Sequence, residues 1–344
     1  MQTTGNSYPF DRPVVILAAP RSGSTLLFET LAHSADLWTI GGESHGVFES
    51  IRQFNPQTGL CNSNALTADD ANEALVSQIR TSFLSQLRNS RGEMLRAAPD
   101  AARHRPRLLE KTPKNAVRVS LLDAIFPDAL YVYLYRNPRE NISSMIDAWH
   151  SGRFVTYRNL PGRHRPWSLL LPPGWENHHQ SSIPQTAAFQ WQAANTAILK
   201  GLAALGRNRW TAVSYGQQVN DAEATVKRLC SFCEISPDGI LQQLEASGTK
   251  LSRYTLTSPA ENKWHRNAAD LREWMPGLAD TIDFIRSSAP ELPADEFDLD
   301  IDPGLSGERT GPGPAATEAL AGRRNERCHC GSGKRFKHCH GAAQ

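Results

Sequence analysis

Short apolar runs alternate with helical apolar stripes along most of the chain. The β-branched run at 13–19 lies between two prolines, and LYVYLY at 130–135 is aromatic and β-branched, so both predict buried strands. Each is followed by apolar residues three or four apart, at 25–32 and at 138–150, which predict helices. Strands that alternate with helices predict an α/β fold, in which helices cover both faces of a mostly parallel sheet.

The same criteria give the remaining elements. Helices are predicted over much of 67–98 and over 185–205 and 224–235, and strands with their outgoing turns at 105–113 and 209–219. Residues 151–182 are dense in Pro, His, Arg and Trp and have a poor period. Because this segment is too long for an ordinary connection, we expect a functional or disordered loop there.

The composition changes near residue 301. Residues 302–322 are rich in Gly, Pro, Ala and Thr, which is typical of a linker, and a Cys- and His-rich tail follows at 323–344. We therefore predict one large α/β domain at 1–301, a linker, and a small terminal module.

The tail has the ligand types of a zinc site. Its C-x-C-x8-C-H pattern supplies Cys328, Cys330, Cys339 and His340, which suit a closed tetrahedral Zn²⁺ site. A module this small cannot bury a core, so the metal should supply its folding energy. The run resembles the SEC-C motif, a zinc module found at the ends of otherwise unrelated proteins. We expect structural zinc, and contact between this tail and a protein or nucleic acid.

The net charge of the chain and the pattern of its first residues restrict the kinds of protein that we expect. The chain has 344 residues and carries 37 Lys and Arg against 35 Asp and Glu, a formal charge of +2, which excludes a generally polyanion-seeking surface but not a local basic site. The first residues lack a leader pattern, and the longest apolar run is far shorter than the roughly 20 residues of a membrane helix. Cys230 and Cys233, in an apolar helical stretch, predict core thiols. We expect a soluble, cytoplasmic protein.

PRSGST at 20–25 connects the first predicted strand to its helix and predicts an anion site. Backbone N–H groups and the helix dipole face the anion, hydroxyl groups can donate to it, and Arg21 adds a charged fork. A nucleotide kinase loop would need a glycine where Ala18 stands and a lysine directly after Gly23. The sequence therefore favours fixed protein donors that act without a metal.

Two motifs together resemble the sulfotransferase family, whose members use 3′-phosphoadenosine 5′-phosphosulfate (PAPS). PRSGSTLLFETL at 20–31 is similar to their 5′-phosphosulfate loop, with Ser24 where Thr is more common, and YRNPRENISSMI at 135–146 is similar to their 3′-phosphate motif. The resemblance implies a P-loop-like α/β fold and transfer of a sulfuryl group from PAPS, which leaves as 3′-phosphoadenosine 5′-phosphate. It also implies that the cofactor is held by Arg21, Ser22, Gly23, Ser24, Thr25, Arg136 and Ser144.

The same resemblance assigns catalytic roles. The motifs are closest to the protein-tyrosine sulfotransferase branch, which has a catalytic Glu at the distance that separates Glu43 from Arg21. Glu43 is thus the implied base, and His45 is the alternative. Lys111 matches a catalytic Lys after a short strand and would help Arg21 to stabilise the leaving group; Lys114 is a weaker candidate.

Two later segments resemble cofactor contacts. Tyr215 is similar to the tyrosine of a "YEDL"-like segment, although Gly216 replaces the usual acid, and Lys263 is similar to the lysine of a late "KW" segment that closes over the cofactor. The expected acceptor is the hydroxyl or amine of a small molecule. Two alternatives remain: a nucleotide-binding adaptor with a zinc tail and no turnover, and a P-loop kinase that depends on Mg²⁺.

Overall fold

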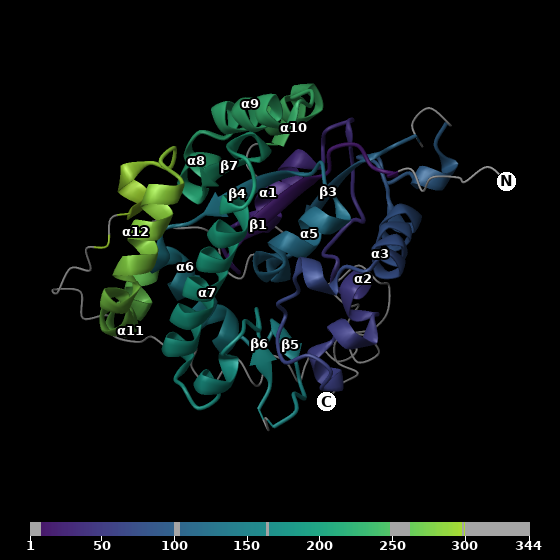
Figure 1. Cartoon of the computed structure of the whole chain (residues 1–344). Helices are drawn as coiled ribbons and strands as arrows, with labels where there is room; N and C mark the ends of the chain where they lie inside the picture. Colours follow the sequence, from purple (N-terminus) through teal and green to yellow (C-terminus); the bar gives the residue numbers. More distant parts are fainter. Residues whose placement is uncertain (1–7, 100–103, 163–164, 248–261, 298, 300–344) are drawn as a thin grey trace, which may run out of the picture.

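A parallel sheet forms the centre of the computed structural model, which describes residues 8–99, 104–162, 165–247, 262–297 and 299. Its five strands are parallel and stand in the order β2-β3-β1-β4-β7 (Figure 1). They are β1 (Val14–Ala18), β2 (Leu37–Trp38), β3 (Arg107–Lys111), β4 (Leu130–Tyr135) and β7 (Trp210–Ser214). The predicted parallel α/β fold is confirmed, whereas the predicted linker at 302–322 and zinc module at 323–344 lie outside the described residues.

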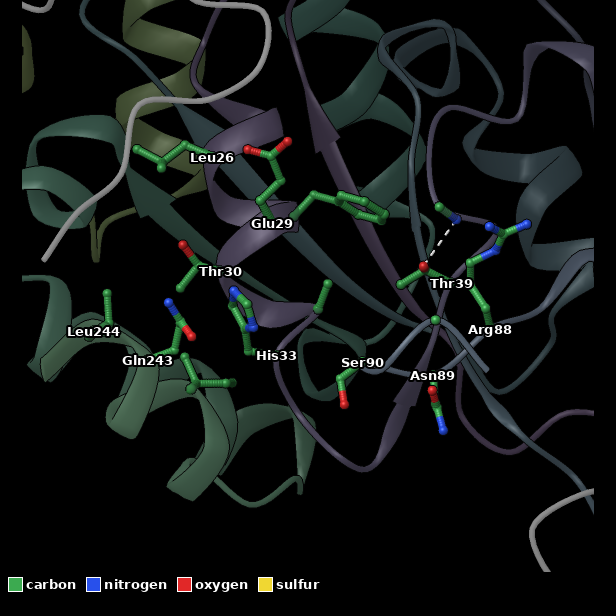
Figure 2. Close-up of a pocket in the computed structure, with 15 residues that line it drawn as sticks. Leu26, Glu29, Thr30, His33, Thr39, Arg88, Asn89, Ser90, Gln243 and Leu244 are labelled. Atoms are coloured by element: carbon green, nitrogen blue, oxygen red, sulfur yellow. Dashed lines mark hydrogen bonds between the residues drawn. The ribbon is translucent and has the colours of Figure 1, made fainter. Parts of the chain in front are cut away.

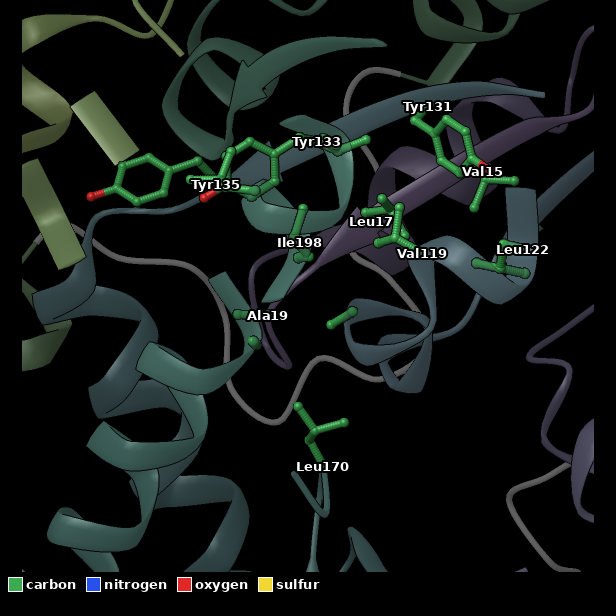
Figure 3. Close-up of a cluster of buried hydrophobic side chains, with 14 of the residues drawn as sticks. Val15, Leu17, Ala19, Val119, Leu122, Tyr131, Tyr133, Tyr135, Leu170 and Ile198 are labelled. Carbon is green, nitrogen blue, oxygen red and sulfur yellow. The ribbon is translucent and has the colours of Figure 1, made fainter. Parts of the chain in front are cut away.

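Side chains of each central strand point alternately to the two faces of the sheet. Ile16 and Ala18 of β1 pack on one face, and Val15 and Leu17 pack on the other, all buried. On the second face the tyrosines of β4 lie beside Val15 and Leu17 (Figure 3). The strands are apolar on both faces because both faces are covered, which explains their nearly continuous apolar runs.

Helices cover each face. The face of Ile16 is covered by α1 (Ser24–Leu31), α9 (Ala222–Cys233) and α10 (Asp238–Ser247). The face of Val15 is covered by α5 (Val119–Ile125), α6 (Pro138–His150), α7 (Ile183–Ala203), α11 (Ala268–Trp274) and α12 (Ala279–Ser288). The predicted start of α6 is confirmed: the Asn137 side chain accepts the N–H of Arg139 at 3.0 Å, and Pro138 is the first helical residue. No helix in the described part of the chain is long and apolar enough to cross a membrane.

Three predicted segments differ from the structure. Residues 151–182 contain β5 (Val155–Tyr157), which pairs antiparallel with β6 (Trp167–Ser168), so the expectation of an irregular loop is partly wrong. Trp167 packs edge-on against Trp149 and Trp175, and these contacts between distant residues leave no periodic signal. Within 67–98 the α-helix is limited to α3 (Glu73–Gln86). In the segment predicted as a strand and turn at 209–219, the strand β7 is followed by α8 (Tyr215–Asn220), which Ser214 caps.

Truncation of β1 should destabilise the fold. Leu17 is fully buried, so Leu17→Ala should lower the free energy of unfolding by about 2–5 kcal/mol, the range for buried leucines. Leu60→Ala is the matched control, because Leu60 is 61% exposed and its loss should cost less than about 0.5 kcal/mol. Urea unfolding of both variants measures the difference, and equal losses would contradict the described position of β1 in the core.

Candidate active site

The loop between β1 and α1 has the backbone shape of an anion site. Arg21 (φ 68°) and Gly23 (φ 95°) are both left-handed, and a Cβ at Gly23 would collide with the ring of Tyr215. Alternation of left- and right-handed residues turns successive N–H groups to one side, which forms a concave donor set at the N-terminus of α1. Gly23 therefore meets both a conformational and a spatial requirement of this loop.

The Ser22 side chain is hydrogen-bonded within the protein. Its hydroxyl donates to the carbonyl of Ala19 at 2.6 Å and to Oδ1 of Asn141 at 3.0 Å, and the residue is buried. Because Asn141 belongs to α6, this hydroxyl ties the loop to that helix. The backbone N–H of Ser22 also donates to the carbonyl of Ala19, at 3.4 Å, so both donors of Ser22 are directed at protein acceptors.

Three cations predicted from separate motifs gather beside this loop. Arg136 donates from Nη1 to the carbonyl of Arg21 at 3.2 Å, and its guanidinium lies 4.3 Å from the centre of the Tyr215 ring. Burial, and then the charge of Arg136, lower the pKa of Arg21 to about 10. Burial also lowers the pKa of Lys263, with smaller contributions that include the charges of Arg136 and Arg21. Cations that oppose each other's protonation are typical of a site for an anion.

The segment of Lys263 is fixed to α6. Lys263 begins the short helix η8 (Lys263–Asn267), and Asn267 donates to Oγ of Ser143 on α6 at 2.9 Å. Ser144, the predicted phosphate ligand, is the next residue of α6 and is partly buried. The predicted ligands Arg136, Ser144 and Lys263 thus lie on α6, at its start, or on the helix packed against it.

The carboxylate of Glu296, from a distant segment of the chain, lies beside Gly216. Glu296 accepts the backbone N–H of Gly216 at 2.9 Å and that of Asn137 at 3.1 Å, and a Cβ at Gly216 would collide with this carboxylate. Glu296 thereby joins the start of α8, where Tyr215 lies, to the start of α6. Sequence reasoning missed Glu296, because it is separated from its partners by 80 and 159 residues.

The other predicted catalytic residues form one hydrogen-bonded cluster. Lys111 ends β3, and its Nζ donates to Oε1 of Glu43 at 2.6 Å and to Oγ1 of Thr25 at 3.0 Å. His45 Nε2 lies 2.7 Å from Oε2 of Glu43. Lys111 thus connects the anion loop to the predicted base, and the Lys111 side chain is only 3% exposed.

The charge state of Glu43 follows from these contacts. Burial raises the pKa of Glu43, but the hydrogen bond with His45 and the charge of Lys111 outweigh burial and lower this pKa to about 2. Glu43 is therefore a carboxylate at neutral pH. Since a base works best with a pKa near the working pH, Glu43 is a weak base while Lys111 is paired with it.

A second ion pair lies next to the first and was largely missed. Lys114 pairs with Glu49, and its Nζ donates to Oη of Tyr157 at 2.8 Å; Tyr157 in turn donates to Oε1 of Glu49 at 2.6 Å. Burial lowers the pKa of Lys114 to about 8. Glu49 ends α2 (His45–Glu49), and no local sequence pattern links it to Lys114, which is 65 residues away.

A cavity of about 400 Å³ lies between α1, α10 and the turn at 88–92 (Figure 2). Its lining includes Leu26 and Thr30 on α1 and His33 just after that helix. None of residues 20–25 lines this cavity, so it is not part of the anion loop.

No group of three or more His, Cys, Asp or Glu that could hold a metal occurs among the described residues. The predicted zinc ligands Cys328, Cys330, Cys339 and His340 lie outside them. Cys230 and Cys233 are buried free thiols, as predicted, and burial raises their pKa values to about 11 and 12.

Comparison with known proteins finds matches to two family models. A model of the sulfotransferase family matches residues 13–238, and a model of the SEC-C motif matches residues 324–342. The protein translocase subunit SecA of Pseudomonas fluorescens (strain Pf0-1) is 41% identical over 78 residues, which are 22% of this chain and 8% of SecA.

Solved structures with some similarity include a sulfotransferase from Alicyclobacillus acidocaldarius, with a TM-score of 0.46 and 14% identity over 80% of this chain and 95% of that one. They also include the sulfotransferase domain of the curacin biosynthetic pathway, with a TM-score of 0.43 and 18% identity over 76% of this chain and 98% of that one.

The Glu43–Lys111 pair should make stability depend on pH. The folded pKa of Glu43 is about 2, below its unfolded value, so the pair stabilises the protein fully above about pH 5 and loses this contribution as the pH falls towards 2. The stability difference between wild type and Glu43→Gln should therefore be largest near neutral pH and shrink below about pH 5. Chemical unfolding at a series of pH values measures it.

Glu223→Gln is the control for this experiment. Glu223 pairs with Lys227 on the exposed face of α9, where an ion pair contributes little. Its stability difference from wild type should be small at every pH. A Glu43→Gln difference that stays constant from neutral to acid pH would contradict the described pair.

Proposed function

The chain belongs to the sulfotransferase family, and we propose that the cluster of Arg21, Glu43 and Lys111 is where it transfers a sulfuryl group from PAPS to a hydroxyl (or amine) of a small molecule. The observation that carries this proposal is the convergence of Arg21, Arg136 and Lys263 beside a concave loop of N–H groups. Family membership favours this enzyme over the adaptor and the P-loop kinase.

The described residues fit a ligand with two separate anionic groups. The N–H groups of 21–25 and the Arg21 side chain would hold the 5′-phosphosulfate, while Arg136 and Ser144, with Lys263 closing from η8, would hold the 3′-phosphate. Tyr215, between Gly23 and Arg136, offers a flat apolar surface between the two anion sites. PAPS, when bound, supplies the sulfuryl group on a phosphate leaving group.

In the proposed reaction, Arg21 and Lys111 act on the leaving group, and Glu43 acts on the acceptor. Arg21 and Lys111 stabilise the charge that grows on the leaving phosphate as its bond to sulfur breaks. Glu43 takes the proton of the acceptor as the new bond to sulfur forms, and His45 is the alternative base. The hydrogen bond with His45 and the charge of Lys111 both lower the pKa of Glu43, so when Lys111 turns its charge to the leaving group one of these two contacts is lost and the basicity of Glu43 rises.

The acceptor is proposed to bind under the β5–β6 hairpin. Phe154, directly before β5, lies 4.5 Å from the guanidinium of Arg21, and Tyr157 at the end of β5 reaches Lys114. This hairpin thus borders both charged groups. Trp167 and Trp175 are buried and pack edge-on against each other, which anchors the hairpin.

The C-terminal tail is proposed to hold one structural zinc through Cys328, Cys330, Cys339 and His340, and to bind a protein or nucleic acid. The match to the SEC-C motif over 324–342 supports this assignment. We also propose a cytoplasmic location, where thiols such as Cys230 and Cys233 stay reduced.

Removal of the proposed catalytic groups should nearly abolish turnover. Arg21→Ala and Lys111→Met should each lower kcat by about 10²–10³, the usual cost of one stabilising donor. Glu43→Gln should lower it by about 10²–10⁴, the usual worth of a general base. Transfer of ³⁵S from labelled PAPS to a panel of small alcohols, phenols and amines, read by mass spectrometry, measures the rates.

Lys227→Met is the matched control, because Lys227 lies in an exposed ion pair on α9 and should leave kcat unchanged. His45→Ala separates the two candidate bases. A loss with His45→Ala that exceeds the loss with Glu43→Gln would assign the base to His45, and unchanged rates in Arg21→Ala would remove its proposed role.

Deletion of 323–344 should remove the zinc. Full-length protein should carry one zinc per chain and the shortened chain none, as measured by inductively coupled plasma mass spectrometry. Cys339→Ser in the full chain should also lose zinc, because a closed site needs all four ligands. Cys230→Ser is the control and should retain it; equal zinc in both chain lengths would show that the assigned ligands are wrong.

A further inference from the structure

The segment that carries Glu43 and Ser44 lies against the end of β3, where Glu110 and Lys111 are. Lys111 shares the sheet face of Leu109, which packs on the α1 side, whereas Glu110 shares the opposite face with Leu108. The segment that carries Glu43 crosses the end of the strand. Glu43 therefore meets Lys111 on one face, and its neighbour Ser44 meets Glu110 on the other.

The contacts on the second face form a closed network. Ser44 donates from Oγ to Oε1 of Glu110 at 2.5 Å, and its backbone N–H donates to Oγ1 of Thr112 at 2.7 Å. Asn115 donates to the same carboxylate oxygen at 3.0 Å. All four residues are buried, and Glu110 is fully inaccessible to solvent. We call Ser44, Glu110, Thr112 and Asn115 the clasp.

A carboxyl group in this place has an energetic cost, since burial disfavours its charged form and raises the pKa of Glu110. An apolar residue would fill the same core position without that cost. Glu110 therefore has a role that an apolar side chain could not perform, and its hydrogen bond with Ser44 is such a role.

The segment before Ser44 contains two glycines, and the N–H of Gly41 donates to Oγ1 of Thr39 at 3.0 Å. Gly41 and Gly42 lack side chains, and Gly41 has a left-handed φ of 79°. Thr39 is fixed on the other side of these glycines, where its N–H donates to the carbonyl of Arg88 at 2.9 Å. Between these two anchors, Glu43 is one residue from the clasp, so the clasp sets where its carboxylate lies.

We propose that Glu110 is a positioning residue, which acts through Ser44 and Thr112 to hold the Glu43 carboxylate against Lys111. The inference rests on the proposed function, because it takes Glu43 and Lys111 as the reacting pair. The Glu110 carboxylate accepts hydrogen bonds from Ser44 and Asn115, and its effect on the reaction passes through the backbone of Ser44.

The test compares variants of the clasp with its conservative form. Ser44→Ala removes the hydroxyl and little volume, and Glu110→Leu removes the carboxyl; each should lower kcat by about 10–100-fold, as loss of an orienting partner does elsewhere. KM for PAPS should change little, because the anion loop is untouched. Glu110→Gln keeps an oxygen that can accept from Ser44 and Asn115, so it should restore most of kcat.

A second readout does not depend on turnover. Carbon-13 NMR of glutamate carboxyl groups, with the Glu43 signal assigned by its loss in Glu43→Gln, should show Glu43 still ionised near pH 3 in wild type. In Ser44→Ala the same signal should titrate at higher pH, because Glu43 is no longer held between Lys111 and His45. Asp123→Asn, which breaks the partly buried pair with Arg209, is the control and should move neither readout.

The outcomes separate the two hypotheses. Loss of thermal stability in Ser44→Ala with unchanged kcat and unchanged Glu43 titration would overturn the positioning role and leave a merely structural one. If wild type neither binds PAPS nor transfers a sulfuryl group, the proposed function fails, while the Glu43 titration still decides whether the clasp sets the position of that carboxylate.

Discussion

The common direction of β3, β1 and β4 is the constraint on which the site depends. Their register pairs Ile16 of β1 with Lys111 of β3, and Ala18 of β1 with Leu134 of β4. Since parallel strands end at the same edge of a sheet, the residues that follow each strand meet there. Lys111, the loop at 20–25 and Arg136 become neighbours for this reason, although 115 residues separate Arg136 from Arg21.

Charge pairing at this edge follows from burial. A lysine as enclosed as Lys111 or Lys114 needs a carboxylate, and the segment 43–49 supplies one to each. Loss of one partner would leave a buried charge uncompensated, which typically costs about 3–5 kcal/mol. The two pairs therefore stabilise the edge together, and Glu43 is held by contacts on both of its oxygens before any substrate arrives.

The local sequence pattern was sufficient to predict those site residues that lie at a strand-to-helix turn. Gly23 and Arg136 lie at such turns, and the parallel sheet brought them together as expected. Glu296, Tyr157 and Glu110 could not be found in this way, because their roles depend on how distant segments pack. The hydrogen bond from the Ser22 hydroxyl to Asn141, which is 119 residues away, could not be predicted from local pattern either.

Recognition of the 3′-phosphate is the most direct test of the account. Calorimetry should compare 3′-phosphoadenosine 5′-phosphate with adenosine 5′-phosphate, for wild type and for Arg136→Ala. The account predicts that wild type binds the first nucleotide at least tenfold more tightly, about 1.4 kcal/mol, and that Arg136→Ala loses most of this preference. Equal affinity of wild type for both nucleotides, or a preference that survives in Arg136→Ala, would contradict the proposed site.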